Sequence, residues 1–201
     1  MRTSPGGKAE RLFHLPRLYH IKITALNAVN GMTSFSLNEE TRGKDVLDIG
    51  CGAVQYLYDP RETKSRTAID PSVEMIEQSK LLYPNDTYRV ASAETLPFPD
   101  KHFDVALFLF VLHHIEPGHW ERALAEARRV SRGVIIILDH TLSHHTLPAL
   151  IQTLWWRIFD GGKSYRTEHE WQELLSGYSI ADYRRMGALF SNICYFKLKV
   201  R

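Results

Sequence analysis

VLDIGCG, residues 46–52, is a short apolar run that ends at a pair of glycines. The run has the length of a buried β-strand, and a Gly-x-Gly sequence lets the backbone turn tightly where the strand ends. Glycines at such a turn also allow a ligand to approach the main chain, because no side chain stands in the way. The stretch therefore predicts a strand that is followed by a ligand-binding loop.

Strands and helices alternate along the chain after this stretch. Further strand-like runs occupy 67–69, 87–90, 103–110 and 134–138, helical patterns occupy 73–83, 120–130 and 168–175, and two last strand-like runs occupy 178–183 and 193–200. Ser72 and Thr167 are the expected N-cap residues of two of these helices. We predict an α/β, Rossmann-like, doubly wound and mostly parallel seven-stranded sheet with an antiparallel C-terminal hairpin and a small N-terminal helical cap.

The length of 201 residues favours a single domain over residues 1–201, because it leaves room for one substantial core. Its expected parts are a helical cap (1–43), a cofactor-binding core (44–139), a substrate-side insertion with a helix (140–175) and the C-terminal hairpin (176–201).

The composition narrows the class of protein. Lys and Arg together number 25 against 23 Asp and Glu, and this balance is not that of a dedicated nucleic-acid binder. The two cysteines, Cys51 and Cys194, exclude a disulfide framework and suit a reducing compartment. The longest apolar run, 105–112, is too short to span a membrane. We therefore expect a cytoplasmic protein with neither a membrane span nor a nucleic-acid partner.

An acidic residue follows the second strand at the spacing that a nucleoside site requires. Asp70 lies 20 residues beyond Gly50, directly after the run 67–69. The carboxyl ends of neighbouring parallel strands meet at one edge of the sheet, and a carboxylate there accepts both hydrogen bonds of a ribose diol. A lone Gly-x-Gly is often an ordinary turn, but its combination with this acid favours a ligand that contains an adenosine-like ribose.

The order of several segments resembles the class I S-adenosylmethionine-dependent methyltransferases of the small-molecule type. The matching segments are Val46–Gly52, Ile69–Ser72, Ala93–Asp100, Phe103–Val105, Val111–His114 and Val130–Gly133, which together cover most of residues 44–139. The resemblance implies S-adenosylmethionine as the cofactor, with S-adenosylhomocysteine as its product, and transfer of a methyl group to an O, N or C atom of a small acceptor.

The resemblance also implies roles for individual residues. Asp48 and the loop of Gly50, Cys51 and Gly52 would hold the methionine part of the cofactor, and Asp48 would also buttress the turn. Asp70 would bind the ribose hydroxyls. The adenine would lie beside Pro71, Ala93 and Glu94, and the sulfonium above Leu109 and Phe110. Glu94 could equally begin a helix, and Leu109 and Phe110 could equally be plain core.

One departure from the family pattern leaves an alternative open. The family has a third glycine where this chain has Val54, followed by Gln55. A β-branched residue resists a positive φ and adds bulk where the cofactor would approach. Either the loop takes another path, or cofactor binding is impaired and the chain is a non-catalytic methyltransferase-like protein that acts as a binding or assembly partner.

Histidines supply the candidate catalytic groups. His113 follows the fourth predicted strand and His140 the fifth, and a neutral imidazole near pH 7 can accept the proton of an OH or NH acceptor. The alternative is that these side chains only complete the strand ends. His144 and His145 lie close to His140 in the sequence, but the spacing fits no zinc site, so we predict no metal.

Parts outside the sheet are expected to select the acceptor. The insertion contributes Leu147, Trp155 and Phe159, whose helical spacing is more typical of core residues than of a pocket. Because little of the chain is left over once a minimal cofactor-binding sheet is built, we expect the acceptor to be a small molecule.

Overall fold

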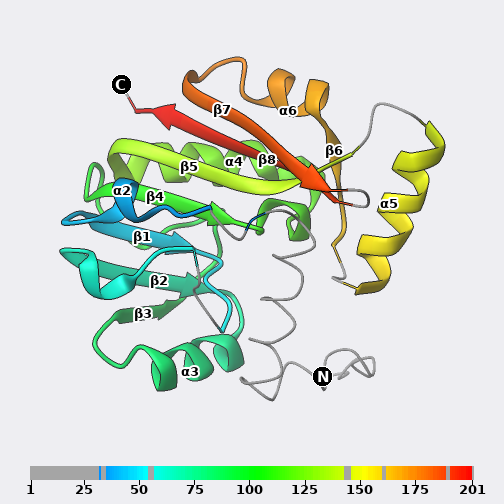
Figure 1. The fold of residues 1–201 in the computed structure, drawn as a ribbon. Coiled ribbons are helices and arrows are strands. Elements are labelled where there is room, and N and C mark those ends of the chain that lie inside the picture. The colour runs from blue at the N-terminus through cyan, green and yellow to red at the C-terminus, as the bar shows by residue number, and fades with distance from the viewer. Residues whose placement is uncertain are drawn as a thin grey trace.

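A computed structural model of the chain describes residue 32 and residues 35–53, 57–142, 146–159, 162–188 and 191–200. Its centre is one sheet with the strand order β3-β2-β1-β4-β5-β8-β7, in which the short strand β6 pairs with β5 (Figure 1). The strands are β1 (Asp45–Ile49), β2 (Ser65–Asp70), β3 (Thr87–Val90), β4 (Phe103–Leu109), β5 (Ser131–Leu142), β6 (Arg166–Thr167), β7 (Ser179–Ala188) and β8 (Ser191–Lys199). Strands β1 to β6 pair in parallel, whereas β8 runs antiparallel to β5 and β7. The predicted α/β fold with an antiparallel C-terminal hairpin is confirmed.

Alternate residues of the central strands enter two separate cores. In β1, Leu47 and Ile49 pack on the side of the sheet that α4 (Trp120–Val130) and α6 (Glu168–Leu174) cover. Val46 enters the core on the opposite side, together with Leu107 of β4. Successive side chains of a strand point to opposite faces, so this alternation fixes which residues remain to meet a ligand at the strand ends.

Helix boundaries agree with the capping residues that the sequence contains. The helix α3 (Val73–Leu82) begins after Ser72, whose side chain accepts a hydrogen bond from the Met75 N–H. The helix α6 begins after Thr167, which forms a reciprocal capping box with Glu170. These side chains satisfy N–H groups that have no partner within the helix, so the predicted N-caps are confirmed. The short helix α2 (Asn38–Thr41) precedes β1.

The structure corrects four details of the prediction. The two-residue strand β6 makes the sheet eight-stranded rather than seven-stranded. Strand β5 continues to Leu142, so His140 belongs to the sheet and not to the insertion. Strand β4 ends at Leu109, because Phe110 leaves the extended conformation with φ 60°. In the helix α5 (Thr146–Phe159), Leu147 is exposed, so its assignment to the core was wrong.

Some predictions concern residues outside the described part of the chain. These are the helical cap over residues 1–31, the departures at Val54 and Gln55, and the side chains of Trp155 and Phe159. Within the described ranges, no helix combines the length and the apolar character that a membrane crossing requires.

Candidate functional site

The glycine loop after β1 is bonded to the end of β2. The N–H groups of Gly50 and Cys51 both donate to the Ile69 carbonyl, at 2.8 and 2.9 Å. Gly50 has φ +70° and Gly52 has φ +56°, conformations that a residue with a side chain adopts only at a cost. A Cβ atom at Gly50 would lie 2.6 Å from Val111 Cγ1, whereas a Cβ atom at Gly52 would meet no described atom within 4 Å. The loop therefore packs closely at Gly50 and is open at Gly52.

Asp70 lies at the end of β2 with its carboxylate toward this loop. Oδ2 accepts a hydrogen bond from the Gly52 N–H at 3.1 Å, and Oδ1 accepts one from the Ser72 N–H at 2.8 Å. Burial raises the pKa of the carboxyl above its usual range, although the two N–H donors act in the opposite direction. A carboxylate has about four acceptor positions. The two backbone bonds leave one position on each oxygen, which is the arrangement that a ribose diol requires.

Asp48 is held inside the protein by a basic partner from β2. Its Oδ2 accepts hydrogen bonds from Arg66 Nη2 at 2.7 Å and from the Tyr58 hydroxyl at 3.1 Å. Arg66 also pairs with Asp86 at 2.6 Å, and both Asp48 and Arg66 are buried. This network ties β1 to β2 two residues before Gly50, and the buttressing of the turn by Asp48 stays a prediction. A contact between Asp48 and the methionine part of a cofactor stays a prediction.

The residues predicted to border the adenine lie around Asp70 and the loop after β3. Pro71 is exposed next to Asp70, and Ala93 is buried. Glu94 lies in a turn rather than at a helix start, and its Oε2 is 3.0 Å from His119 Nδ1. These positions are compatible with an adenine pocket, and their contact with adenine stays a prediction.

Phe110 adopts an unusual backbone conformation where β4 ends. Its φ of 60° is rare for a bulky residue and costs about 1–3 kcal/mol, so the surrounding structure must impose it. The Phe110 N–H donates to the Leu138 carbonyl of β5 at 2.7 Å. Leu109 and Phe110 are both partly exposed. Strained residues concentrate at functional sites, and this one lies at the same edge of the sheet as Gly52 and Asp70.

A buried His–Asp pair joins the turn that follows β4 to β5. His113 Nδ1 is 2.5 Å from Asp139 Oδ1, and the His113 N–H donates to Asp139 Oδ2 at 3.3 Å. The backbone N–H of His140 donates to Asp139 Oδ1 at 2.7 Å. Burial by itself would raise the pKa of Asp139, but the adjacent His113 outweighs it and holds that pKa below the usual range. The carboxylate is thus ionised and accepts the Nδ1 proton of His113.

Aromatic side chains enclose the two histidine rings. The Trp156 ring of α5 stacks on His140 with 3.9 Å between centroids, and the Tyr165 ring stacks on His113 at 5.4 Å. Gly162 is in contact with this group, because a Cβ atom there would collide with the Tyr165 hydroxyl and lie 2.7 Å from His113 Cδ2. The segment that begins at Gly162 therefore shields the His–Asp pair from water.

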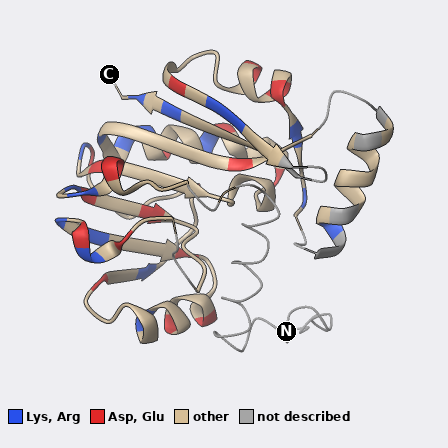
Figure 2. Cartoon of the chain, viewed as in Figure 1, with Lys and Arg blue, Asp and Glu red and all other residues tan. Residues whose placement is uncertain are grey.

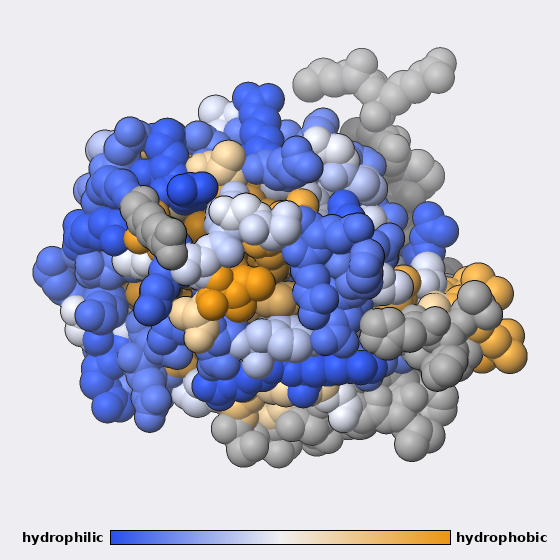
Figure 3. All heavy atoms as spheres, turned by 90° about the horizontal axis from the view of Figure 1, so that it is seen from above, coloured by the Kyte–Doolittle hydropathy of each residue, from blue (hydrophilic) through white to orange (hydrophobic). Residues whose placement is uncertain are grey.

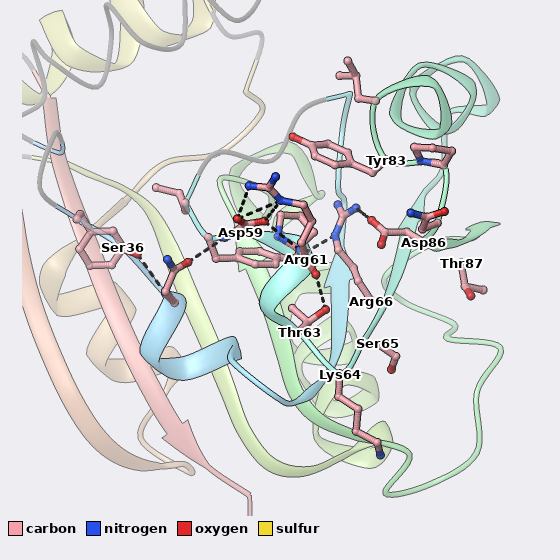
Figure 4. A pocket seen from close by; sticks show the side chains of 18 residues that line it. Ser36, Asp59, Arg61, Thr63, Lys64, Ser65, Arg66, Tyr83, Asp86 and Thr87 are labelled. Carbon is pink, nitrogen blue, oxygen red and sulfur yellow. Dashed lines mark hydrogen bonds and ion pairs between the residues drawn. The ribbon is translucent and has the colours of Figure 1, made fainter.

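A pocket of about 950 Å³ lies elsewhere, at the amino ends of β2 and β3 (Figure 4). The charged side chains in it are paired: Arg61 contacts Asp59, and Arg66 contacts Asp86. None of the residues predicted to bind the cofactor lines this pocket. Parallel strands place their carboxyl ends at the opposite edge, so the pocket is separate from the predicted site.

The structure brings together predicted site residues that are distant in the sequence. It also shows hydrogen-bond partners that the sequence analysis missed. Asp70 and the glycine loop lie at the same edge of the sheet, as the spacing predicted, and the structure adds the hydrogen bond between them. Asp139 directly precedes the candidate His140 in the sequence, but its bond to His113 spans 26 positions and depends on the pairing of β4 with β5. Arg66 was missed as the partner of Asp48. The available signal was Asp48 itself, a charged residue between the apolar Leu47 and Ile49 of a buried strand, since such buried charges are almost always paired.

Comparison with known proteins shows similarity to methyltransferases. Residues 47–137 match the family model described as a methyltransferase domain. The chain is 28% identical over 141 residues to the malonyl-[acyl-carrier protein] O-methyltransferase of Pectobacterium atrosepticum, over 70% of this chain and 54% of that protein. It is 36% identical over 77 residues to the tRNA U34 carboxymethyltransferase of Nautilia profundicola, over 35% of this chain and 26% of that protein.

A solved structure shows the same fold. The magnesium protoporphyrin IX methyltransferase of Synechocystis, solved with bound S-adenosylmethionine, matches with a TM-score of 0.60 at 15% identity, over 100% of this chain and 87% of that one. The chain spans about half the length of the curated relatives that it matches.

Proposed function

We propose that this chain, whose residues 47–137 match a methyltransferase domain, is a class I S-adenosylmethionine-dependent methyltransferase that transfers a methyl group to a small-molecule acceptor. The observation that carries the proposal is the contact between Asp70 and the Gly52 N–H, which places a buried carboxylate against an open glycine loop. The spacing of the two motifs predicted that both lie at this edge of the sheet.

The residues at the strand ends fit the cofactor. Asp70 accepts the two ribose hydroxyls on the positions that its backbone bonds leave, and the absence of a side chain at Gly52 lets the methionine part approach the loop. Pro71, Ala93 and Glu94 border the adenine in this proposal. When bound, S-adenosylmethionine supplies a methyl group that is electrophilic because the sulfur carries a positive charge.

The His–Asp pair fits the removal of a proton from an OH or NH acceptor. Because the ionised Asp139 only accepts hydrogen bonds, His113 carries a proton on Nδ1, and this bond orients its imidazole ring. In this proposal the imidazole of His113 takes the proton of the acceptor, while the acceptor forms its bond to the methyl carbon and the bond from that carbon to sulfur breaks, which leaves S-adenosylhomocysteine. His140 donates to the same carboxylate through its backbone N–H. In this proposal its ring lines the acceptor side together with Trp156.

A small acceptor fits this chain better than a nucleic acid does. The formal net charge of +2 lacks the surplus of Lys and Arg with which proteins neutralise phosphates. The similarity to a tRNA-modifying enzyme is limited to 35% of the chain and does not supply such a surplus. A malonyl group carried by a protein, the substrate in the name of the relative from Pectobacterium, belongs to the acceptors to be tested first.

Calorimetric titration with S-adenosylmethionine and S-adenosylhomocysteine tests the proposal. We expect both to bind wild-type protein, and Asp70→Ala to weaken binding by about 10- to 100-fold, because two hydrogen bonds to a charged group are lost. Lys64→Ala, at the amino edge of the sheet, is the matched control and should bind normally. Absence of binding at millimolar concentration would favour the non-catalytic alternative, and normal binding by Asp70→Ala would refute the ribose assignment.

Release of S-adenosylhomocysteine in the presence of candidate acceptors then tests catalysis. We expect His113→Ala to reduce turnover while cofactor affinity stays within a few-fold of wild type, because His113 acts on the acceptor proton. Equal turnover of wild type and His113→Ala would return His113 to a purely structural role.

A further inference from the structure

The helix α5 presents a continuous apolar face to solvent. Leu147, Leu150, Ile151 and Leu154 are 66%, 65%, 52% and 60% exposed. Leu150 and Ile151 follow Leu147 by three and four residues, and Leu154 follows Ile151 and Leu150 by three and four, so the four side chains lie on one side of the helix. Hydrophobic atoms gather at the right-hand edge of the molecule in Figure 3, where α5 lies in Figure 1. We call these four residues the outer face of α5.

The opposite side of the same helix is anchored to the sheet. Trp156 is buried with its ring on His140, and Gln152 is buried as well. The helix therefore has a defined orientation, and its outer face is turned away from the protein by the packing of its inner face. Large apolar side chains on an exposed face carry a hydration cost that contact with an apolar partner removes.

The size of the outer face argues against a second copy of the chain as that partner. Four large side chains at these exposures present roughly 400 Å² of apolar surface, the range in which exposed patches mark interaction sites. A stable protein interface needs about 800 Å² on each partner. A lipid surface has no such threshold, because side chains insert one by one between the acyl chains.

The charge around the outer face fits an anionic lipid surface. Residues 140–159 contain no Asp or Glu, and Arg157, the basic residue of α5, is exposed near the end of the helix. Figure 2 shows this helix with basic and without acidic colouring, unlike α3 and α6. A helix that lies in a membrane interface typically combines an apolar face with basic residues, and anionic headgroups attract the latter.

We propose that the outer face of α5 binds reversibly to an anionic lipid surface. The helix is 14 residues long and lies in the plane of the interface without crossing it. Because Trp156 on its inner face contacts His140, this binding holds the acceptor side of the candidate site beside the lipid. The lipid binding does not depend on the proposed methyl transfer, so each can fail without the other.

Cosedimentation of the full chain with vesicles tests this proposal. We expect binding to vesicles of phosphatidylcholine with phosphatidylglycerol, and weaker binding to phosphatidylcholine alone. Leu150→Glu combined with Leu154→Glu should weaken binding at least tenfold, because it replaces apolar contact by like charge. The matched control is Leu81→Glu on α3, where an 81% exposed leucine lies away from the outer face and binding should be kept.

Three results would overturn the proposal. One is no binding of the wild-type chain to either kind of vesicle, and another is equal binding by the α5 variant and Leu81→Glu. The third is a dimer in analytical ultracentrifugation that the α5 variant abolishes, which would assign the outer face to a second copy. Leu150→Asn combined with Leu154→Asn adds no charge and replaces the double Glu variant if that one fails to fold.

Discussion

Alanine at Gly50 and alanine at Gly52 should have different consequences, although both glycines have positive φ. The backbone strain of an L-residue in this region is about 1–2 kcal/mol, and both variants incur it. At Gly50 the new methyl group also lies 2.6 Å from Val111 Cγ1, and overpacking of this kind costs about 1–3 kcal/mol more. We expect Gly50→Ala to lower the free energy of unfolding by about 2–5 kcal/mol and Gly52→Ala by about 1–2 kcal/mol.

The two substitutions should affect cofactor affinity in the reverse order, with Gly52→Ala having the larger effect. A methyl group at Gly52 meets no described atom of the protein within 4 Å, so the space that it enters is the space proposed for the methionine part of the cofactor. Gly52→Ala should therefore weaken S-adenosylmethionine binding more than Gly50→Ala does, in folded protein. Urea unfolding followed by tryptophan fluorescence measures the stabilities, and calorimetry measures the affinities.

A second substitution separates the clash from the strain. Val111→Ala removes both methyl groups that a side chain at position 50 would meet. In the Gly50→Ala background it should cost less stability than it does in the wild-type chain, because it relieves the overpacking. Equal destabilisation by Gly50→Ala and Gly52→Ala, or additive effects of Gly50→Ala and Val111→Ala, would refute this reasoning.

Three further predictions follow from buried charges. Arg66→Met leaves Asp48 buried without its basic partner and should lower the free energy of unfolding by about 3–5 kcal/mol in urea unfolding; a loss below 1 kcal/mol would contradict the buried pair. Asp139→Asn should keep cofactor affinity but reduce turnover about 10²–10⁴-fold, since His113 loses the acceptor for its Nδ1 proton; nitrogen NMR of the imidazole should show a changed tautomer, and an unchanged tautomer would count against the pair. S-adenosylmethionine affinity should fall on acidification as Asp70 protonates, at a less acidic pH than the usual aspartate pKa of about 4 because burial raises this pKa; calorimetry across pH should find a flatter profile in Asp70→Asn.

Local sequence signals predicted most of the helices and strands. Ser72 and Thr167 marked helix starts that the structure contains, because an N-cap acts on N–H groups within its own first turn. The apolar runs predicted the strands for a similar reason, since burial on both faces leaves no polar position. The boundaries at Leu109 and Leu142 were missed because partner strands set them: Phe110 bonds to Leu138, and β5 is extended by pairing with β6 and β8.

The cofactor side of the candidate site was predictable to a similar extent. Gly52 and Asp70 follow the neighbouring parallel strands β1 and β2, so their positions in the sequence imply that they lie at one edge of the sheet, where the structure shows their hydrogen bond. The pairing of Asp48 with Arg66 was not predictable in this way. Its partner depends on the side chain of Arg66 reaching it across the β1–β2 pairing, and sequence patterns do not show which buried charges meet.

The sequence by itself determined the strand–loop–helix order, the glycine turn and the acid that follows it, because each depends on residues within a few turns of one another. Only the tertiary structure decided that His113 is held by Asp139, that His140 lies in the sheet, and that the leucines of α5 face solvent. These features depend on strand order and on the way a helix is turned against the sheet. Both are set by packing between distant segments, and hydrophobic periodicity describes each segment only by itself.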